Sequence, residues 1–192
     1  MILQINEITG LQYIPQFITQ AEHNSLIMKI DNQPWLNDLK RRVQHYGYKY
    51  DYKAKKIDMS MHLGNLPDWL LELAYKLYDH QLFAVLPDQV IVNEYLPGQG
   101  ISKHIDCISC FSDTIISLSL GSGCIMDFTN VEAGVKIPVF LEPHSIVIMT
   151  DKARYQWSHS IPARKVDRFQ GHIIKRERRI SLTFRKVILT HN

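Results

Sequence analysis

The sequence predicts an α+β protein in which helices pack on a β-rich sandwich or barrel. Two apolar stripes with helical spacing lie within the first eighty residues, and many short strands separated by turn residues follow residue 88. Of the 192 residues, 45% are hydrophobic and 21% are charged, which is enough for a buried core. Because no linker or repeat divides the chain, we expect a single domain over residues 1–192.

Two helices are predicted in the N-terminal part. Thr19 and Glu22 have the spacing of a capping box, and Pro67 is typical of a first helical residue. Each is followed by an apolar stripe with the period of a helix. The stripes are Leu26, Ile27 and Ile30 after the first, and Trp69, Leu70, Leu73 and Leu77 after the second. We expect both stripes to face the core.

The rest of the chain predicts strands. The segment RRVQHYGYKYDY, residues 41–52, is aromatic, basic and interrupted by Gly47, which favours a β-hairpin or an extended ribbon. Further strands are expected at about 89–95, 101–105, 114–120, 123–128, 136–142, 145–150, 155–159 and 178–186. Many short strands at this spacing are typical of a sandwich or a barrel.

The charge balance is mild. Lys and Arg number 22 and Asp and Glu 19, so the formal net charge is +3, which permits a polyanionic partner without requiring one. No stretch is long and apolar enough to cross a membrane, and the first residues, MILQINEITG, lack the pattern of a secretory signal. We expect a cytoplasmic protein, a monomer, with no membrane partner.

Three cysteines are too few for a disulfide scaffold and indicate a reducing compartment. Cys107 and Cys110 form a Cys-x₂-Cys pair, which is half of a structural zinc site, but no second pair exists. We therefore favour the interpretation that Cys107, Cys110 and Cys124 are buried apolar residues, with zinc binding as the alternative.

The segment His104-Ile105-Asp106 contains two candidate metal ligands. Residues two apart on a strand point to the same face, so an imidazole and a carboxylate project side by side. His159, on a later predicted strand, supplies a third donor. Two His and one carboxylate form the facial triad of non-haem Fe(II) oxygenases, which leaves coordination positions open. The alternative is a hydrogen-bonded His–Asp pair, or a pair on the surface.

The C-terminal strand indicates a site for an acid. Ile180, Leu182 and Phe184 alternate with polar residues, so Arg179 and Arg185 lie on one face, roughly 20 Å apart. Two arginines folding inward would bracket a short dicarboxylate, because guanidinium binds carboxylate with two parallel hydrogen bonds. The alternative is a strand of charges facing solvent.

Asn93 and Tyr95 are a second pair two apart on a strand. Both are neutral donors that can orient a carboxylate or a keto acid. The alternative is a buried tyrosine whose hydroxyl group is satisfied within the protein.

Four segments together resemble a known family. NEYLPGQGISKHID, SLSLGSGCIMDF, WSHS and RRISLTFRKV look like the AlkB family of Fe(II)/2-oxoglutarate-dependent dioxygenases, from about residue 40 to residue 187. Within this family the chain is most similar to the dioxygenase module of the AlkB homologue that acts on wobble uridine in tRNA. The resemblance implies a double-stranded β-helix, a jelly-roll or cupin-like barrel, which agrees with the number of predicted strands.

The resemblance also implies an enzyme that uses Fe(II), 2-oxoglutarate and O₂ and releases succinate and CO₂. By position, the iron ligands are His104, Asp106 and His159. The family's 2-oxoglutarate contacts fall on Asn93, Tyr95, Arg179, Ser181 and Arg185. Arg179 is expected on the distal carboxylate with Tyr95 and Ser181, and Arg185 and Asn93 nearer the end that chelates iron.

The function implied is oxidative dealkylation of nucleic-acid bases, of the DNA or RNA repair type. One alternative is hydroxylation of a modified tRNA wobble uridine, and another is a non-catalytic cupin-like module that binds a metal or a small acid. The chain departs from the family pattern at one position near the target base. Bacterial repair members carry an acidic residue two positions after the Asp ligand, where this chain has Ile108, which cannot accept a hydrogen bond from an exocyclic amine of the base.

A basic and aromatic segment is a candidate for contact with single-stranded nucleic acid or with a strand whose base is flipped out. Cations interleaved with aromatic rings suit a phosphate backbone beside a stacked base. The candidates are Arg41, Arg42, Tyr46, Tyr48 and Tyr50. The alternative is a solvated hairpin whose tyrosines cover the barrel.

Overall fold

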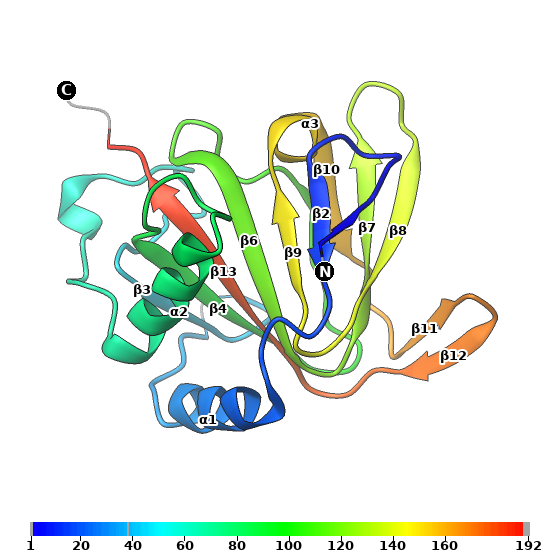
Figure 1. Cartoon of the computed structure of the whole chain (residues 1–192), viewed down its shortest axis with the longest axis horizontal. Coiled ribbons are helices and arrows are strands. Elements are labelled where there is room, and N and C mark those ends of the chain that lie inside the picture. Colours follow the sequence, from blue (N-terminus) through cyan, green and yellow to red (C-terminus); the bar gives the residue numbers. More distant parts are fainter. Residues whose placement is uncertain (1, 38, 190–192) are drawn as a thin grey trace.

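The computed structural model describes residues 2–37 and 39–189, and most of its strands form two antiparallel sheets (Figure 1). The larger sheet has the spatial order β1 (Leu3–Gln4), β2 (Leu11–Ile14), β9 (Ile146–Met149), β6 (Phe111–Gly121), β13 (Arg179–Val187), β4 (Gln89–Tyr95) and β3 (Val43–Tyr46). The smaller sheet has the order β5 (Ile101–His104), β10 (Trp157–Ile161), β7 (Cys124–Asn130) and β8 (Lys136–Leu141). A separate hairpin, β11 (Val166–Phe169) and β12 (His172–Lys175), projects from this body.

In the part of the chain that the structure describes, three α-helices and one 3₁₀ turn accompany the strands. These are α1 (Gln20–Asp31), the 3₁₀ turn η1 (Met59–Met61), α2 (Asp68–Asp79) and α3 (Asp151–Tyr155). The predicted capping box is present, because the Thr19 side chain accepts from the Glu22 backbone and the Glu22 side chain accepts from the Thr19 backbone. Pro67 occupies the N-cap position, one residue before the helix that it was expected to begin. No helix within residues 2–37 and 39–189 is long and apolar enough to span a membrane.

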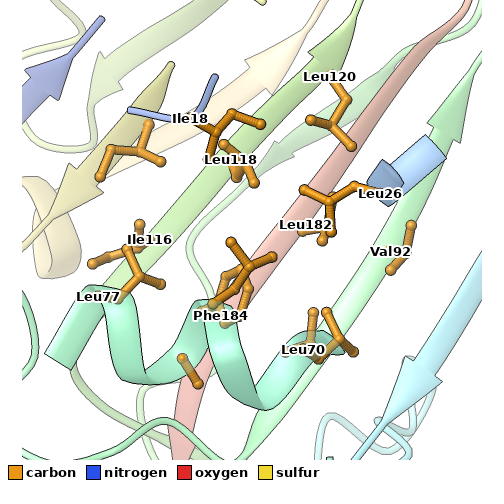
Figure 2. Packing of buried hydrophobic residues seen from close by; sticks show 14 of the residues in the cluster. Ile18, Leu26, Leu70, Leu77, Val92, Ile116, Leu118, Leu120, Leu182 and Phe184 are labelled. Carbon is orange, nitrogen blue, oxygen red and sulfur yellow. The ribbon is translucent and has the colours of Figure 1, made fainter. Parts of the chain in front are cut away.

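The larger sheet is buried on both faces. On one face, side chains of β4, β6 and β13 pack against α1 and α2 (Figure 2). The strands contribute Val92, Leu118 and Leu182 to this cluster, and the helices contribute Leu26 and Leu70. A second apolar cluster joins the opposite face to the smaller sheet and includes Phe111, Ile115, Met126, Phe128 and Leu141. The strand alternation therefore divides β13 between a structural face and a face turned toward the smaller sheet.

The predicted α+β class is confirmed, and several details differ. Strand β10 begins at Trp157, because α3 extends to Tyr155, the residue at which this strand was expected to begin. In the segment 41–52 only Val43–Tyr46 forms a strand, and it pairs with β4 at the edge of the larger sheet instead of closing a hairpin on itself. The strands β1, β2, β11 and β12 were not predicted.

Candidate metal centre and cavity

A cavity of about 880 Å³ lies against both sheets. The larger sheet contributes polar side chains of β4 and β13, and the smaller sheet contributes residues of β5 and β10. Residues of the segments 39–41, 50–55 and 105–111 also line it, together with Ser117, Met126 and Met149. Arg179, Ser181, Thr183 and Arg185 all line it, so the polar face of β13 faces this cavity and not solvent, as the alternation predicted for an acid-binding site.

The structure brings together the three residues that the sequence singled out as metal ligands. His104 ends β5, Asp106 follows two residues later, and His159 lies directly opposite His104 on β10. The two imidazole rings have centroids 4.4 Å apart. One donor atom from each of the three side chains lies within 4.8 Å of the other two. Two imidazoles and one carboxylate are the donor set of a non-haem Fe(II) site.

Hydrogen bonds orient two of these donors. Nδ1 of His104 lies 2.8 Å from the Ser102 carbonyl oxygen, which only accepts, so Nδ1 carries the proton and Nε2 keeps its lone pair. Arg185 donates twice to Oδ1 of Asp106, from Nε at 3.1 Å and from Nη2 at 2.7 Å. The other oxygen, Oδ2, lies 3.7 Å from Nε2 of His159 and is left to serve as the ligand atom.

The electrostatics favour the metal-binding protonation states. Burial opposes ionisation of Asp106, but its neighbours, Arg185 foremost, outweigh burial and hold the pKa of this carboxyl group below its usual range. Burial, reinforced by His104, lowers the pKa of His159 to about 3. An ionised carboxylate beside a neutral imidazole is the state that binds a cation without first releasing a proton.

The buried guanidinium of Arg179 has two nitrogen atoms that donate no hydrogen bond among the described residues. Its side chain is 3% exposed, and Nη2 donates to Oγ of Ser119 at 2.9 Å. Its Nε and Nη1 have no hydrogen-bond partner anywhere in residues 2–37 and 39–189. A buried guanidinium left in this way costs free energy until an anion completes it. Tyr95 lies beneath this guanidinium, 5.5 Å from the ring centroid to Cζ.

The predicted nucleic-acid contacts are separated by the fold. Arg41 and Tyr50 line the cavity, and Nε of Arg41 donates to Oδ1 of Asn93 at 2.8 Å. The other three lie elsewhere among the described residues. Arg42 pairs with Glu94 at 2.6 Å and covers Trp35, Tyr46 packs edge-on against Trp69, and Tyr48 packs against His62.

Three residues beyond the five nucleic-acid candidates also line the cavity. Lys55, Lys103 and Tyr52 join Arg41 and Tyr50 there. Lys103 stands directly before His104, so its position in the motif was a usable signal. Lys55 and Tyr52 reach the cavity through a tight turn closed by the bridge between Asp51 and Lys56, which no motif indicates. Asp106 is the only carboxylate among the described residues that line the cavity, whereas five Arg and Lys side chains line it, so this lining is markedly cationic.

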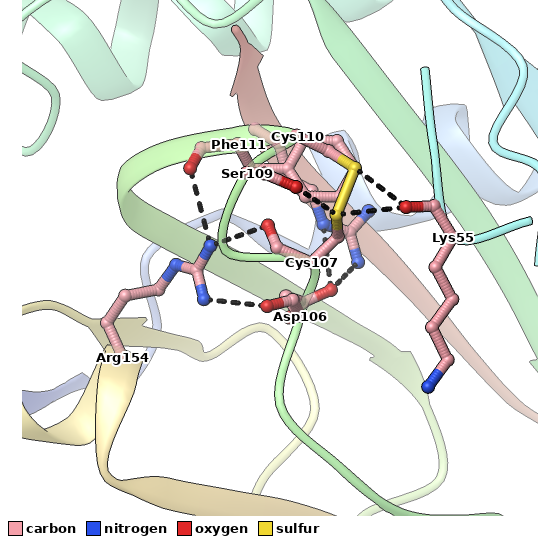
Figure 3. The surroundings of a disulfide bond; sticks show 8 residues. Lys55, Asp106, Cys107, Ser109, Cys110, Phe111 and Arg154 are labelled. Carbon is pink, nitrogen blue, oxygen red and sulfur yellow. Dashed lines mark hydrogen bonds and ion pairs between the residues drawn. A yellow bond between two sulfur atoms is a disulfide. The ribbon is translucent and has the colours of Figure 1, made fainter.

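The loop that follows Asp106 overturns the interpretation of two cysteines (Figure 3). Cys107 and Cys110 are joined by a disulfide, whereas Cys124 is the buried free thiol that the sequence predicted. Both sulfur atoms of the disulfide lie 3.4 Å from the carbonyl oxygen of Lys55. Two cysteines three residues apart in a loop can reach one another without any scaffold of further bridges, which a count of cysteines does not detect.

Arg154 of α3 holds the same loop by its backbone. Its guanidinium donates to the carbonyl oxygens of Asp106 at 2.9 Å and Cys107 at 3.0 Å (Figure 3). Longer hydrogen bonds reach the carbonyl oxygens of Ser112 and Phe111. Because α3 leads directly into β10, this buried arginine ties the segment carrying His159 to the loop carrying Asp106.

Residues 10–185 match the 2OG-Fe(II) oxygenase superfamily, and the chain belongs to this superfamily. Among its relatives is the "Alkylated DNA repair protein ALKBH8 homolog" of Arabidopsis thaliana, which is 37% identical over 94% of this chain and 59% of the relative. Another is the mouse (Mus musculus) "tRNA (carboxymethyluridine(34)-5-O)-methyltransferase ALKBH8", 39% identical over 93% of this chain and 30% of the relative. The predicted resemblance to AlkB homologues is thereby confirmed.

The chain spans less than two thirds of either relative's length. A solved structure, "The structure of OsALKBH1", has a TM-score of 0.76 and 15% sequence identity, covering 97% of this chain and 100% of that one. This likeness confirms the fold that the resemblance implied, the double-stranded β-helix of the 2OG-Fe(II) oxygenases.

Proposed function

We propose that this chain is an Fe(II)- and 2-oxoglutarate-dependent dioxygenase that oxidises an alkyl group on a nucleic-acid base and so removes it. The observation that carries the proposal is the pair of unpartnered donors on Arg179 in the same cavity as the His104, Asp106 and His159 cluster. A three-donor metal site and a buried cation that lacks an anion are the two requirements of this cofactor pair.

The residues fit these cofactors. Nε2 of His104, Oδ2 of Asp106 and the imidazole of His159 would hold Fe(II), and bound Fe(II) with 2-oxoglutarate and O₂ supplies the oxidation of a C–H bond. Arg179 would bind the distal carboxylate of 2-oxoglutarate, with the Tyr95 and Ser181 side chains beside it. Nε and Nη1 of Arg179, which have no partner among the described residues, would then gain an acceptor.

Two of the expected 2-oxoglutarate contacts take different roles in this proposal. Arg185 has Asp106 and Gln89 as partners, which supports a role in positioning the Asp106 carboxylate rather than in binding the keto acid. Asn93 accepts from Arg41, which supports a role in fixing that cation at the cavity wall. Both residues would then act on the site through a neighbouring side chain.

A nucleic-acid substrate is supported by the charge of the cavity and by the named activities of the relatives. Arg41, Lys55 and Lys103 suit the phosphates that flank a target nucleotide, and Tyr50 and Tyr52 offer rings on which a base stacks. The target base must be single-stranded or flipped out to reach a buried metal. That the protein acts as a cytoplasmic monomer stays a prediction from its composition.

A second candidate is hydroxylation of a modified tRNA wobble uridine without removal of the group. Ile108 lines the cavity, is 55% exposed, and offers no acceptor for an exocyclic amine. A uracil ring has no exocyclic amine, so this position accommodates it without an unsatisfied donor. The name of the mouse relative, which specifies a uridine of tRNA, favours the same candidate.

The proposal is tested by mass spectrometry of nucleosides from tRNA and from alkylated DNA after incubation with the protein, Fe(II) and 2-oxoglutarate. Loss of an alkyl group with release of formaldehyde is expected, and it should be absent with His104→Ala. Gain of one oxygen on a modified uridine would favour the second candidate. Unchanged nucleosides without succinate formation would contradict both and favour the non-catalytic binding module.

A further inference from the structure

Positive charge is concentrated in and around the β11–β12 hairpin. Residues 164–179 contain seven of the 22 Lys and Arg of the chain and two of the 19 Asp and Glu. This segment therefore carries a net of five positive charges. The formal net charge of the whole chain is only +3, so the remaining residues together are net negative. The mild overall charge thus conceals one basic segment, in which Arg164 and Arg176 are paired with Asp167 and Arg178 with Glu94.

Buried ion pairs fix the root of this hairpin to the smaller sheet. Asp167 is fully buried and receives two hydrogen bonds from Arg176, at 2.6 and 2.8 Å, and one from Arg164 at 2.7 Å. The backbone N–H of Ile125 on β7 donates to the same carboxylate. Phe169 stacks on Phe140 of β8, with ring centroids 5.4 Å apart. The hairpin is therefore held in one orientation.

The opposite face of the hairpin is exposed. Val166 pairs with Lys175 and Arg168 pairs with Ile173, so these four side chains share one face. Val166 is 39% and Ile173 62% exposed, and both cations are exposed as well. Neither Arg168 nor Lys175 forms a side-chain hydrogen bond or ion pair with any residue in the described part of the chain. We call these four residues the outward face.

The root of the hairpin lies close to the cavity. The hairpin follows Ile161, which lines the cavity, and the Arg164 carbonyl accepts from the backbone of Gly98 at 3.2 Å. In the same loop, the Gln99 side chain donates to the Lys40 carbonyl, between the cavity-lining residues Leu39 and Arg41. The loop of Gly98 and Gln99 therefore contacts both the hairpin root and the cavity wall at residues 39–41. A polymer that enters the cavity past this wall would pass near the hairpin.

We infer that the outward face of the β11–β12 hairpin binds the sugar-phosphate backbone of the nucleic acid, outside the target nucleotide. This inference rests on the proposed function and extends it to a second contact surface. Arg168 and Lys175 would neutralise phosphates, while Val166 and Ile173 lie against sugars. The rigid root lowers the entropy lost on binding. Such contacts position the polymer without reading its sequence.

The test is the salt dependence of binding to single-stranded RNA and DNA oligonucleotides and to tRNA, for the wild type and for the double variant Arg168→Gln/Lys175→Gln. Each neutralised phosphate contributes about 0.7 to the slope of log K against log salt on a single strand, so the slope should fall by about 1.4. The matched control Lys29→Gln/Lys152→Gln removes two exposed cations far from the hairpin in sequence and should keep the wild-type slope.

Folding and chemistry are checked in parallel. Arg168→Lys/Lys175→Arg keeps both charges and should keep the slope, and succinate release without nucleic acid should be equal in all variants. A wild-type slope in the Gln double variant on every probe would overturn the hairpin surface and leave the proposed function standing. A wild type that binds none of the probes would overturn both.

Discussion

Asp106 has two oxygens, and its environment gives them different tasks. Arg185 holds Oδ1 through two donors, while Oδ2 faces His159. The sequence could predict that Asp106 and His104 share a face, because residues two apart on a strand do so. It could not predict the hydrogen bond to Arg185, because that contact depends on how β13 is placed across the cavity. The family resemblance consequently suggested another role for this arginine.

The unpartnered donors of Arg179 give a prediction about cosubstrate affinity. Arg179→Lys keeps the charge but loses the planar fork. It should weaken 2-oxoglutarate binding by about 1.5 to 3 kcal/mol, the usual value of a charged hydrogen bond, or roughly ten- to hundredfold in Kd. Calorimetric titration of the Mn(II)-loaded protein with 2-oxoglutarate measures this effect.

The neighbouring residue supplies the matched control. Arg178 has the opposite strand parity and pairs with Glu94 at 2.7 Å and with Asp31, away from the cavity lining. Arg178→Lys should therefore leave the Kd for 2-oxoglutarate unchanged. Equal losses in the two variants, or no loss in Arg179→Lys, would contradict the assignment of Arg179.

The buried His159 predicts a pH dependence of stability in the metal-free protein. Its pKa is lowered to about 3 in the folded chain, against an ordinary value of 6.5. Between these values the unfolded chain binds a proton that the folded chain does not, so stability is lost as pH falls. The slope is at most about 1.4 kcal/mol per pH unit from this group.

The variant His159→Gln cannot take up this proton. The Tm of the wild type, measured with a chelator present, should therefore fall toward that of the variant as the pH is lowered from 6.5. Titrating groups that do not contact His159 behave alike in both proteins and cancel in the difference. A Tm difference that stays constant with pH would refute the buried, neutral state of His159.

At the scale of elements, α3 is short but links two parts of the metal site. The guanidinium group of Arg154 donates to four carbonyl oxygens, and the single ammonium group in Arg154→Lys cannot reproduce this set of hydrogen bonds. Losing such support around a metal ligand typically costs 10–100-fold in affinity, so about that loss is expected for Mn(II). Calorimetry on the chelator-treated protein measures it, with Arg168→Lys as the control. Unchanged Mn(II) affinity in a folded Arg154→Lys variant would refute the role.

The elements that the sequence predicted are those with a strong local signal. The α1 helix has its capping box, and β13 alternates strictly from Arg179 to Arg185. The elements that it missed are short, such as β1 with two residues and β11 and β12 with four each. Strands of this length have too few positions to show a period, and their pairing is decided by tertiary contacts.

At the scale of the whole molecule, one sheet serves two purposes. Its face toward α1 and α2 is apolar, while residues of alternate parity on β4 and β13 line the cavity. The metal cluster requires a further condition, because His104 and His159 meet only through the register of β5 with β10. The sequence identified both residues but contains no local signal for that register, which the packing of the two sheets sets.

The measurement that tests the central claim most directly is succinate formation from 2-oxoglutarate under air, with Fe(II) and with tRNA or alkylated DNA present. We predict succinate in the wild type, more of it with nucleic acid than without, and background levels in Asp106→Ala, which lacks one of the three ligands. Wild-type succinate at the level of Asp106→Ala with every nucleic acid would contradict the claim that this cavity is an oxygenase site.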